Sequence, residues 1–228
     1  MARTRSRRYE KAAAKVDRNK RYPVTEGFAL IKSLAGPKFD ESVDVAVRIG
    51  IDAKKTDQLV RGSVSLPKGT GKSIKIAVFA EGDRAKAALE AGADFVGSAD
   101  LADKIEKGWT DFDMTIASPD MMKYVGKLGK VLGPQGKMPS PKAGTVTPNV
   151  AAAVKEFKAG KIEFRTDAGA NVHAAIGKKS FAADDLASNL SAFLDHLRTL
   201  RPAQAKGEFI KKVVGSTSMG PGVALAIQ

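Results

Sequence analysis

The sequence has no cysteine, only two histidines (His173 and His196) and no apolar run that approaches the roughly 18 residues of a membrane span. Without cysteine there can be no disulfide, thiolate zinc site or cysteine nucleophile. The two histidines are too few and too far apart to indicate a metal site. The N-terminus is basic, but no apolar segment follows it as in a secretory signal. We therefore expect a cytoplasmic protein with no cofactor, no metal and no membrane partner.

The charge is strongly positive and unevenly spread along the chain. The net charge is +13, from 38 basic and 25 acidic residues, which favours a polyanionic partner: nucleic acid first, an anionic membrane second. Residues 1–68 carry a net +8, residues 69–157 only +1, and residues 158–228 +4. A near-neutral segment thus interrupts a basic sequence. This predicts a basic domain formed by 1–68 plus 158–228, with residues 69–157 as an inserted second domain.

The inserted segment alternates between strand and helix patterns. Its first strand, Ile74–Ala80, is almost wholly apolar, as expected for a strand buried on both faces. The pattern predicts further strands at Asp94–Val96 and Asp113–Ala117, and helices at Arg84–Ala91, Ala99–Lys107, Asp120–Val125 and Asn149–Lys158, the last capped by Thr147. Such alternation predicts a doubly wound (Rossmann-like) α/β domain with a parallel sheet.

The outer segments predict a different architecture. Val43, Val45, Val47 and Ile49 alternate with less apolar residues, which indicates a strand with one face in water. Further strands are expected at Arg61–Leu66, Lys161–Thr166, Asn171–Ile176, Glu208–Val214 and Val223–Ile227, and helices at Thr25–Leu34 and Asp184–Leu200. We expect an open α+β sheet with helices on one side. Glycines at both crossings between the domains suggest a two-stranded hinge.

Lys127–Gly144 contains four lysines, four glycines, three prolines and no acidic residue. Proline and glycine disfavour a regular helix, so we expect a loop. Its apolar residues, such as Leu132 and Met138, favour an ordered loop over a flexible linker. Backbone amides together with Lys127, Lys130, Lys137 and Lys142 are typical of a surface that meets phosphate.

Catalytic patterns are weak. Gly69–Ser73 (GTGKS) lacks the earlier glycine of a phosphate-binding loop, and a predicted strand follows it where a helix is required. No G-x-S-x-G element occurs, and no dinucleotide-binding glycine motif follows a strand of the inserted domain. We expect no enzyme. A nucleotide-binding enzyme built on the inserted domain is the distant alternative, and a membrane-surface protein the third.

Two segments of the basic domain are candidates for binding. Lys38–Ser42 places Phe39 among charges just before a strand, and Ser216–Pro221 combines three hydroxyls, Met219 and a Gly-Pro turn. Hydroxyls and turn amides can bond phosphate and ribose oxygens, while Phe39 and Met219 can pack on bases or sugars. Hairpin chemistry explains the same residues equally well.

Taken together, the motifs resemble the large-subunit ribosomal protein L-one family, in its bacterial branch. The resemblance rests on LGKVLGPQGKMPSPKAGTV in the lysine-rich loop, with KFDESVDVAVRIGID, VRGSVSLPKGTGK, AGADFVG, GKIEFRTD and STSMGPG in family order over nearly the whole chain. Small departures from the family wording are Ala53, Leu59, Ser63 and Ser218.

The resemblance implies a discontinuous basic domain with an inserted doubly wound one. It implies direct binding to 23S rRNA of the large ribosomal subunit, in the mobile stalk where deacylated tRNA leaves the E site. It also implies repression of its own operon mRNA, and we expect a monomer off the ribosome. Carried over residue by residue, the RNA contacts are Lys38, Phe39, Ser42, Arg165, Asp167, Thr217, Ser218, Met219 and Gly220. The four lysines of the loop would form a secondary RNA or tRNA surface.

Overall fold

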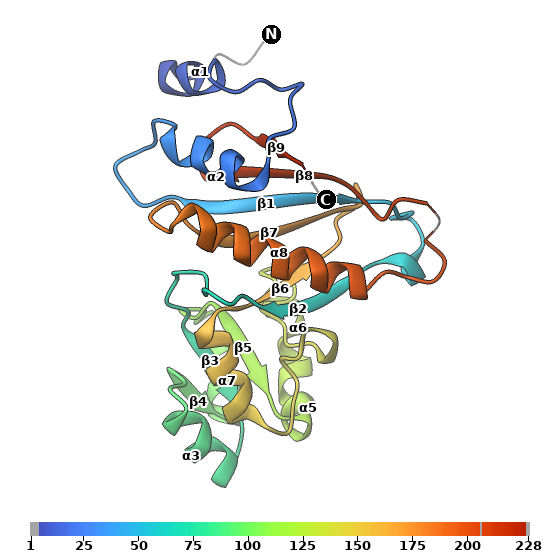
Figure 1. Cartoon of the computed structure of the whole chain (residues 1–228). Coiled ribbons are helices and arrows are strands. Elements are labelled where there is room, and N and C mark those ends of the chain that lie inside the picture. Colours follow the sequence, from blue (N-terminus) through green and yellow to red (C-terminus); the bar gives the residue numbers. More distant parts are fainter. Residues whose placement is uncertain (1–4, 206, 227–228) are drawn as a thin grey trace. The chain divides into compact units, whose positions relative to one another are not determined.

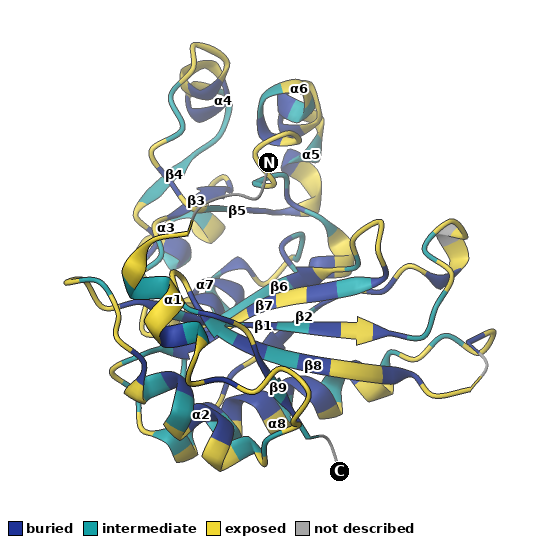
Figure 2. Cartoon of the chain, turned by 90° about the horizontal axis from the view of Figure 1, so that it is seen from above, coloured by how far each residue is buried: buried dark blue, intermediate teal, exposed yellow. Residues whose placement is uncertain are grey.

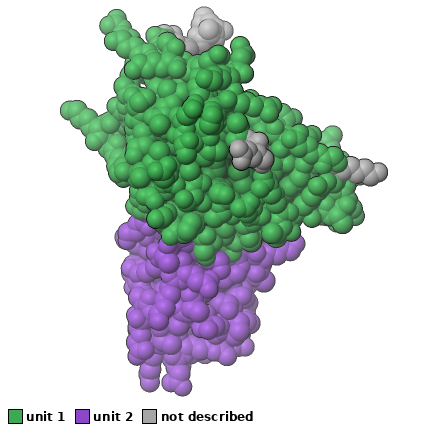
Figure 3. Space-filling view, viewed as in Figure 1, with its two compact units in different colours: residues 1–71, 162–228 green, residues 72–161 purple. Residues whose placement is uncertain are grey.

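The computed structural model describes residues 5–205 and 207–226 (Figure 1). The chain divides into two compact units, Met1–Gly71 with Ile162–Gln228, and Lys72–Lys161 (Figure 3). The boundaries expected from charge, after residues 68 and 157, lie a few residues earlier in the chain. Gly69, Gly71 and Gly160 near these boundaries have φ values of 66°, 67° and 113°, which glycine adopts without strain.

The first unit contains a four-stranded antiparallel sheet in the order β7-β1-β8-β9. Its strands are β1 (Ser42–Ile49), β7 (Asn171–Lys178), β8 (Ile210–Thr217) and β9 (Val223–Leu225). Val43, Val45 and Val47 are fully buried, whereas the intervening residues of β1 are at least partly exposed, so the expected alternation is confirmed. A further pair of strands, β2 (Arg61–Ser65) and β6 (Lys161–Arg165), forms a separate two-stranded sheet.

Two helices cover the buried face of this sheet. Helix α2 (Val24–Ser33) packs on β8 and β9, and α8 (Ala183–Thr199) packs on β7 and on α2. Figure 2 shows both helices along the same side of the sheet. The side chains of α8 that the sequence assigns to one face, Leu186, Leu190, Phe193, Leu194 and Leu197, are all buried. The 3₁₀ turn Thr56–Gln58 lies between β1 and β2.

The sequence did not predict helix α1 (Arg7–Ala13). Ser6 caps it by accepting a hydrogen bond from the Tyr9 amide, and Ala12 and Val16 are buried in the core of the first unit. Further along, the Tyr22 amide donates to Ala224, and the Tyr22 carbonyl accepts from Ala226. The segment before α2 thus pairs with the edge of β9. Of the strand expected at Val223–Ile227, Ile227 lies outside the described residues.

The second unit is built on a parallel sheet in the order β4-β3-β5. Its elements are β3 (Ile76–Phe79), α3 (Asp83–Glu90), β4 (Phe95–Gly97), α4 (Ala99–Glu106), β5 (Met114–Ala117), α5 (Met122–Val125), α6 (Gly129–Leu132) and α7 (Val150–Ala159), with 3₁₀ turns at Pro119–Met121, Gly126–Leu128 and Pro141–Ala143. Ala77 and Phe79 contribute to one core cluster and Ile76 and Val78 to another, so both faces of the sheet are covered. The expected strand–helix alternation is confirmed.

Two local expectations in this unit need correction. Part of Lys127–Gly144 is helical, because Leu128 and Leu132 on the short turns around α6 are buried in the core. Tertiary packing here outweighs the low helix propensity of glycine. The cap of α7 is Asn149, whose side chain accepts from the Ala152 amide; Thr147 instead accepts from the Asn149 amide.

Candidate nucleic-acid interface

The turn after β8 brings the two candidate segments together. The Ser218 amide donates to the Ser42 carbonyl over 3.1 Å, and the Ser42 amide donates to the Ser218 hydroxyl oxygen over 3.2 Å. A third hydrogen bond runs from the Met219 amide to a carboxylate oxygen of Glu41, over 2.9 Å. Residues 41–42 and 218–219 are therefore one hydrogen-bonded unit, although they are far apart in sequence.

Two large apolar side chains are exposed here, one within this hydrogen-bonded unit and one two residues before Glu41. Phe39 is 54% exposed and Met219 is 53% exposed. Exposed large apolar side chains are informative when they gather at one place, because burial of such groups is the main favourable term in association. Phe39 and Met219 come from two segments that hydrogen bonds hold together, and they give this surface its apolar component.

The backbone donors of the turn are already in use. The Gly220 amide donates to the Thr217 carbonyl over 3.1 Å, and the amides of Ser218 and Met219 are bonded as described above. This corrects the expectation that the Gly220 amide bonds RNA. Thr217 itself is only 5% exposed. The turn offers the hydroxyl proton of Ser218 and the side chain of Met219.

Glu41 is the residue that sequence reasoning missed. It is 1% exposed; its Oε1 holds the Met219 amide, and its Oε2 lies 3.6 Å from the Lys179 ammonium. Lys179 in turn donates to the Leu34 carbonyl over 2.6 Å. A parity signal was available, because position 41 continues the inward-facing series of Val43 and Val45 toward the N-terminus.

The two cations predicted to bind phosphate make no polar contact with other described residues. Lys38 and Arg165 are exposed, and neither has a hydrogen-bond or ion-pair partner among the described residues. Ser42, by contrast, is held from both sides, since its hydroxyl oxygen also accepts from the Lys178 ammonium over 3.0 Å.

Asp167 accepts hydrogen bonds from the backbone just before and at the start of β7. Its Oδ1 accepts from the amides of Asn171 and Gly169 over 2.7 and 2.8 Å, and its Oδ2 lies 3.4 Å from the His173 ring nitrogen. The hydrogen bond from the Asn171 amide is the main reason why the pKa of Asp167 is lowered. The exposed His173 is next to Ala46 of β1 in register.

One further acid lies on the water-facing side of β1. Burial raises the pKa of the Asp44 carboxyl, while Lys178 and His173 nearby act in the opposite direction. The open face of the sheet is therefore a mixture of acid, base and small side chains and not a uniformly basic surface.

The four lysines of the second unit are not equivalent. Lys127, Lys130 and Lys142 are exposed. Lys137 is half-buried: its ammonium donates to the Thr110 carbonyl over 2.9 Å and lies 5.0 Å from the centre of the Phe112 ring. The sequence placed Lys137 on the same binding surface as the others, whereas its ammonium group contacts Thr110 and Phe112 of its own unit.

The side chains that this candidate interface presents are cations, a hydroxyl and apolar groups, which are the groups that bind nucleic acid. Within the described residues, no group of three or more His, Cys, Asp or Glu side chains could hold a metal ion, and no helix is long and apolar enough to cross a membrane. The chain matches the Ribosomal protein L1p/L10e family over residues 30–221.

Similar proteins carry the name large ribosomal subunit protein uL1. That of Azoarcus sp. (strain BH72) is 56% identical, over 96% of this chain and 94% of its own length. That of Bordetella pertussis (strain Tohama I) is 56% identical, over 97% and 96%. That of Ralstonia pickettii (strain 12J) is 56% identical, over 96% and 94%. The chain therefore belongs to the ribosomal protein L1p/L10e family, as its motifs predicted, and is a structural ribosomal protein and not an enzyme.

Proposed function

We propose that this protein binds 23S rRNA of the large ribosomal subunit through the surface around Phe39 and Met219. The proposal rests on two exposed apolar side chains, Phe39 and Met219, carried by segments that are hydrogen-bonded to each other. The cations Lys38 and Arg165, which have no partner among the described residues, belong to the same compact unit, residues 1–71 and 162–228. The net charge of +13 supports a polyanionic partner. The family membership supports a ribosomal role.

The internal hydrogen bonds of the turn decide which groups reach the RNA. Met219 and Phe39 pack on exposed sugar or base faces, and Ser218 donates its hydroxyl proton to a phosphate or ribose oxygen. Lys38 and Arg165 neutralise phosphates. Asp167 can accept from a ribose 2′-hydroxyl or from a base N–H group, but it cannot pair with phosphate, because a carboxylate repels phosphate. Thr217, Gly220 and Ser42 hold the turn in shape.

The protein acts in the mobile stalk of the large subunit, where deacylated tRNA leaves the E site, and is a cytoplasmic monomer when it is off the ribosome. Lys127, Lys130 and Lys142 form the secondary surface toward RNA or tRNA, and Lys137 supports it from inside. The protein also represses its own operon by binding mRNA that imitates the ribosomal site. A competition assay tests this: the operon leader should displace 23S rRNA, and Met219→Ala should weaken both complexes alike.

The main experiment compares Met219→Ala with Leu89→Ala. Leu89 is a matched control because it is 56% exposed, close to the 53% of Met219, but belongs to the other unit. Binding of the full chain to transcribed 23S rRNA is measured by filter retention at several salt concentrations. Loss of the Met219 contact should weaken binding by about 5- to 150-fold, from about 1–3 kcal/mol of apolar burial. An unchanged affinity of Met219→Ala, or equal losses in the two variants, contradicts the proposal.

A further inference from the structure

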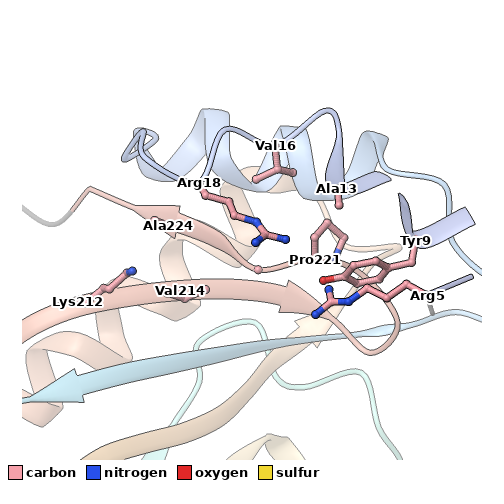
Figure 4. Close-up of a pocket in the computed structure, with 10 residues that line it drawn as sticks. Arg5, Tyr9, Ala13, Val16, Arg18, Lys212, Val214, Pro221 and Ala224 are labelled. Carbon is pink, nitrogen blue, oxygen red and sulfur yellow. The ribbon is translucent and has the colours of Figure 1, made fainter. Parts of the chain in front are cut away.

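A cavity of about 330 Å³ lies between the N-terminal segment and the strands β8 and β9 (Figure 4). Arg5, Tyr9 and Arg18 line it on one side, and Lys212, Val214 and Pro221 on the other. Val214 belongs to the water-facing side of β8, since its neighbour Val213 is fully buried against the core. The cavity thus lies on the face of the sheet that α2 and α8 leave open. Its volume is at the lower end of the range for small-ligand sites, about 300–1,000 Å³.

The cavity is positively charged. Its lining includes three cations, Arg5, Arg18 and Lys212, and no acidic residue. None of the three has an ion-pair partner among the residues that the structure describes. Cations that converge without a counter-charge repel one another, and an anionic group placed between them relieves that repulsion.

The cavity also has a flat aromatic wall. The guanidinium of Arg5 lies over the Tyr9 ring, 4.5 Å from its centre, and Figure 4 shows the two side chains stacked at one end of the cavity. Tyr9 is only half-buried. An arginine–aromatic pair of this kind is a platform on which a nucleic-acid base stacks. Pro221 and Val214 supply apolar surface beside it.

The position of the cavity connects it to the proposed RNA surface. Pro221 follows Gly220 directly, so the turn that carries Met219 also forms one wall. On the adjacent strand, the exposed Arg48 of β1 is the register partner of Lys212. An RNA strand bound at the turn would therefore lie next to the cavity that Arg5, Arg18 and Lys212 line.

We infer that this cavity holds one nucleotide of the bound RNA strand, with its base against Tyr9 and its phosphates between Arg5, Arg18 and Lys212. This inference rests on the proposed function, because it assumes RNA at the Met219 turn. A nucleotide combines a flat apolar base with an anionic phosphodiester, which matches the aromatic wall and the three cations together. An acidic peptide would use the cations but would leave the platform empty.

The test uses the full chain and transcribed 23S rRNA. The variants are Tyr9→Ala, Tyr9→Phe, the double variant Arg18→Ala/Lys212→Ala, and Lys11→Ala as a control on the same helix that does not line the cavity. Loss of two phosphate contacts should lower the slope of log affinity against log salt by about 1.4–1.8. Tyr9→Ala should weaken binding by roughly 5- to 150-fold, whereas Tyr9→Phe keeps the ring and stays near wild type.

The outcomes separate this inference from the proposed function. If wild-type protein does not bind 23S rRNA, the proposed function fails. If Met219→Ala weakens binding but the cavity variants behave like Lys11→Ala, only the nucleotide site is overturned. If the cavity variants lose affinity for poly-glutamate as strongly as for RNA, the cavity is a general polyanion site, and the inference is again overturned. Circular dichroism of each variant checks that α1 remains folded.

Discussion

The buried carboxylate of Glu41 accepts a hydrogen bond from the main-chain amide of Met219, 178 positions further along the chain, over 2.9 Å. One partner is 1% exposed and the other 53%. A buried carboxylate therefore fixes the backbone of a residue whose side chain is exposed. The side chain of Met219 is free to contact a partner while its backbone stays fixed, and such preorganisation reduces the entropy lost on binding.

Replacing Glu41 should affect both stability and binding. Glu41→Ala leaves the Met219 amide without its acceptor and the Lys179 ammonium without its buried ion-pair partner, at a cost of roughly 2–4 kcal/mol in the free energy of unfolding. Glu41→Gln keeps an acceptor for the amide and should lose less. Urea denaturation measures the cost, with the exposed Glu81→Ala as control. Equal stability of Glu41→Ala and Glu81→Ala would show that the hydrogen bond is unimportant.

Gly220→Ala should disturb the turn directly. A β-carbon at position 220 would overlap the Thr217 hydroxyl, so either the turn opens or the threonine shifts. We expect a loss of about 1–3 kcal/mol in stability, as for other overpacked sites, and weaker binding to 23S rRNA. Gly126→Ala is the matched control, because a β-carbon there meets nothing within 4 Å. The idea fails if the two variants melt at the same temperature.

Asp167 should contribute acid-sensitive stability. Its pKa is lowered in the folded protein, chiefly by the hydrogen bond from the Asn171 amide, from an ordinary value of 3.8. The ionised form is therefore favoured by folding, so its contribution is complete above pH 3.8 and is lost as pH falls through the lowered pKa. Asp167→Ala should reduce stability at pH 7 and show a smaller further loss between neutral and strongly acidic pH. Parallel pH profiles of the two proteins would contradict this.

Lys137 and Lys142 should behave differently, although they lie in the same lysine-rich segment. Lys137→Met removes the hydrogen bond to the Thr110 carbonyl but keeps the aliphatic packing, which should cost about 1 kcal/mol of stability. Lys142→Met changes an exposed residue and should leave the unfolding midpoint unchanged. Thermal denaturation of both variants checks this; equal midpoints would mean that the internal contact of Lys137 carries no weight.

The sequence predicted the elements whose patterns are long or strongly periodic. The alternation of β1, the leucine face of α8 and the strand–helix repeats of the second unit all match the structure. These patterns reflect burial, which acts on whole segments and leaves a clear signature.

The sequence did not predict features that depend on distant contacts. Helix α1 has seven residues, too few for a stable isolated helix, and is held by the burial of Ala12 and Val16. Helix α6, which begins at Gly129 and is followed by Gly133, forms because Leu132 is buried in the core. At the candidate site, the motifs indicated Phe39 and Met219, but the partners of Glu41 and Lys137 come from remote segments and could not be read from local sequence.

The pairing of Tyr22 with β9 affects how readily one copy of the chain can associate with another. An open sheet normally ends in a strand with unpaired amides and carbonyls, which can recruit the same edge of another molecule. Here the Tyr22 amide and carbonyl bond Ala224 and Ala226, so the β9 edge is occupied by the chain's own N-terminal segment. The β9 edge of one molecule is thereby protected against pairing with the same edge of another.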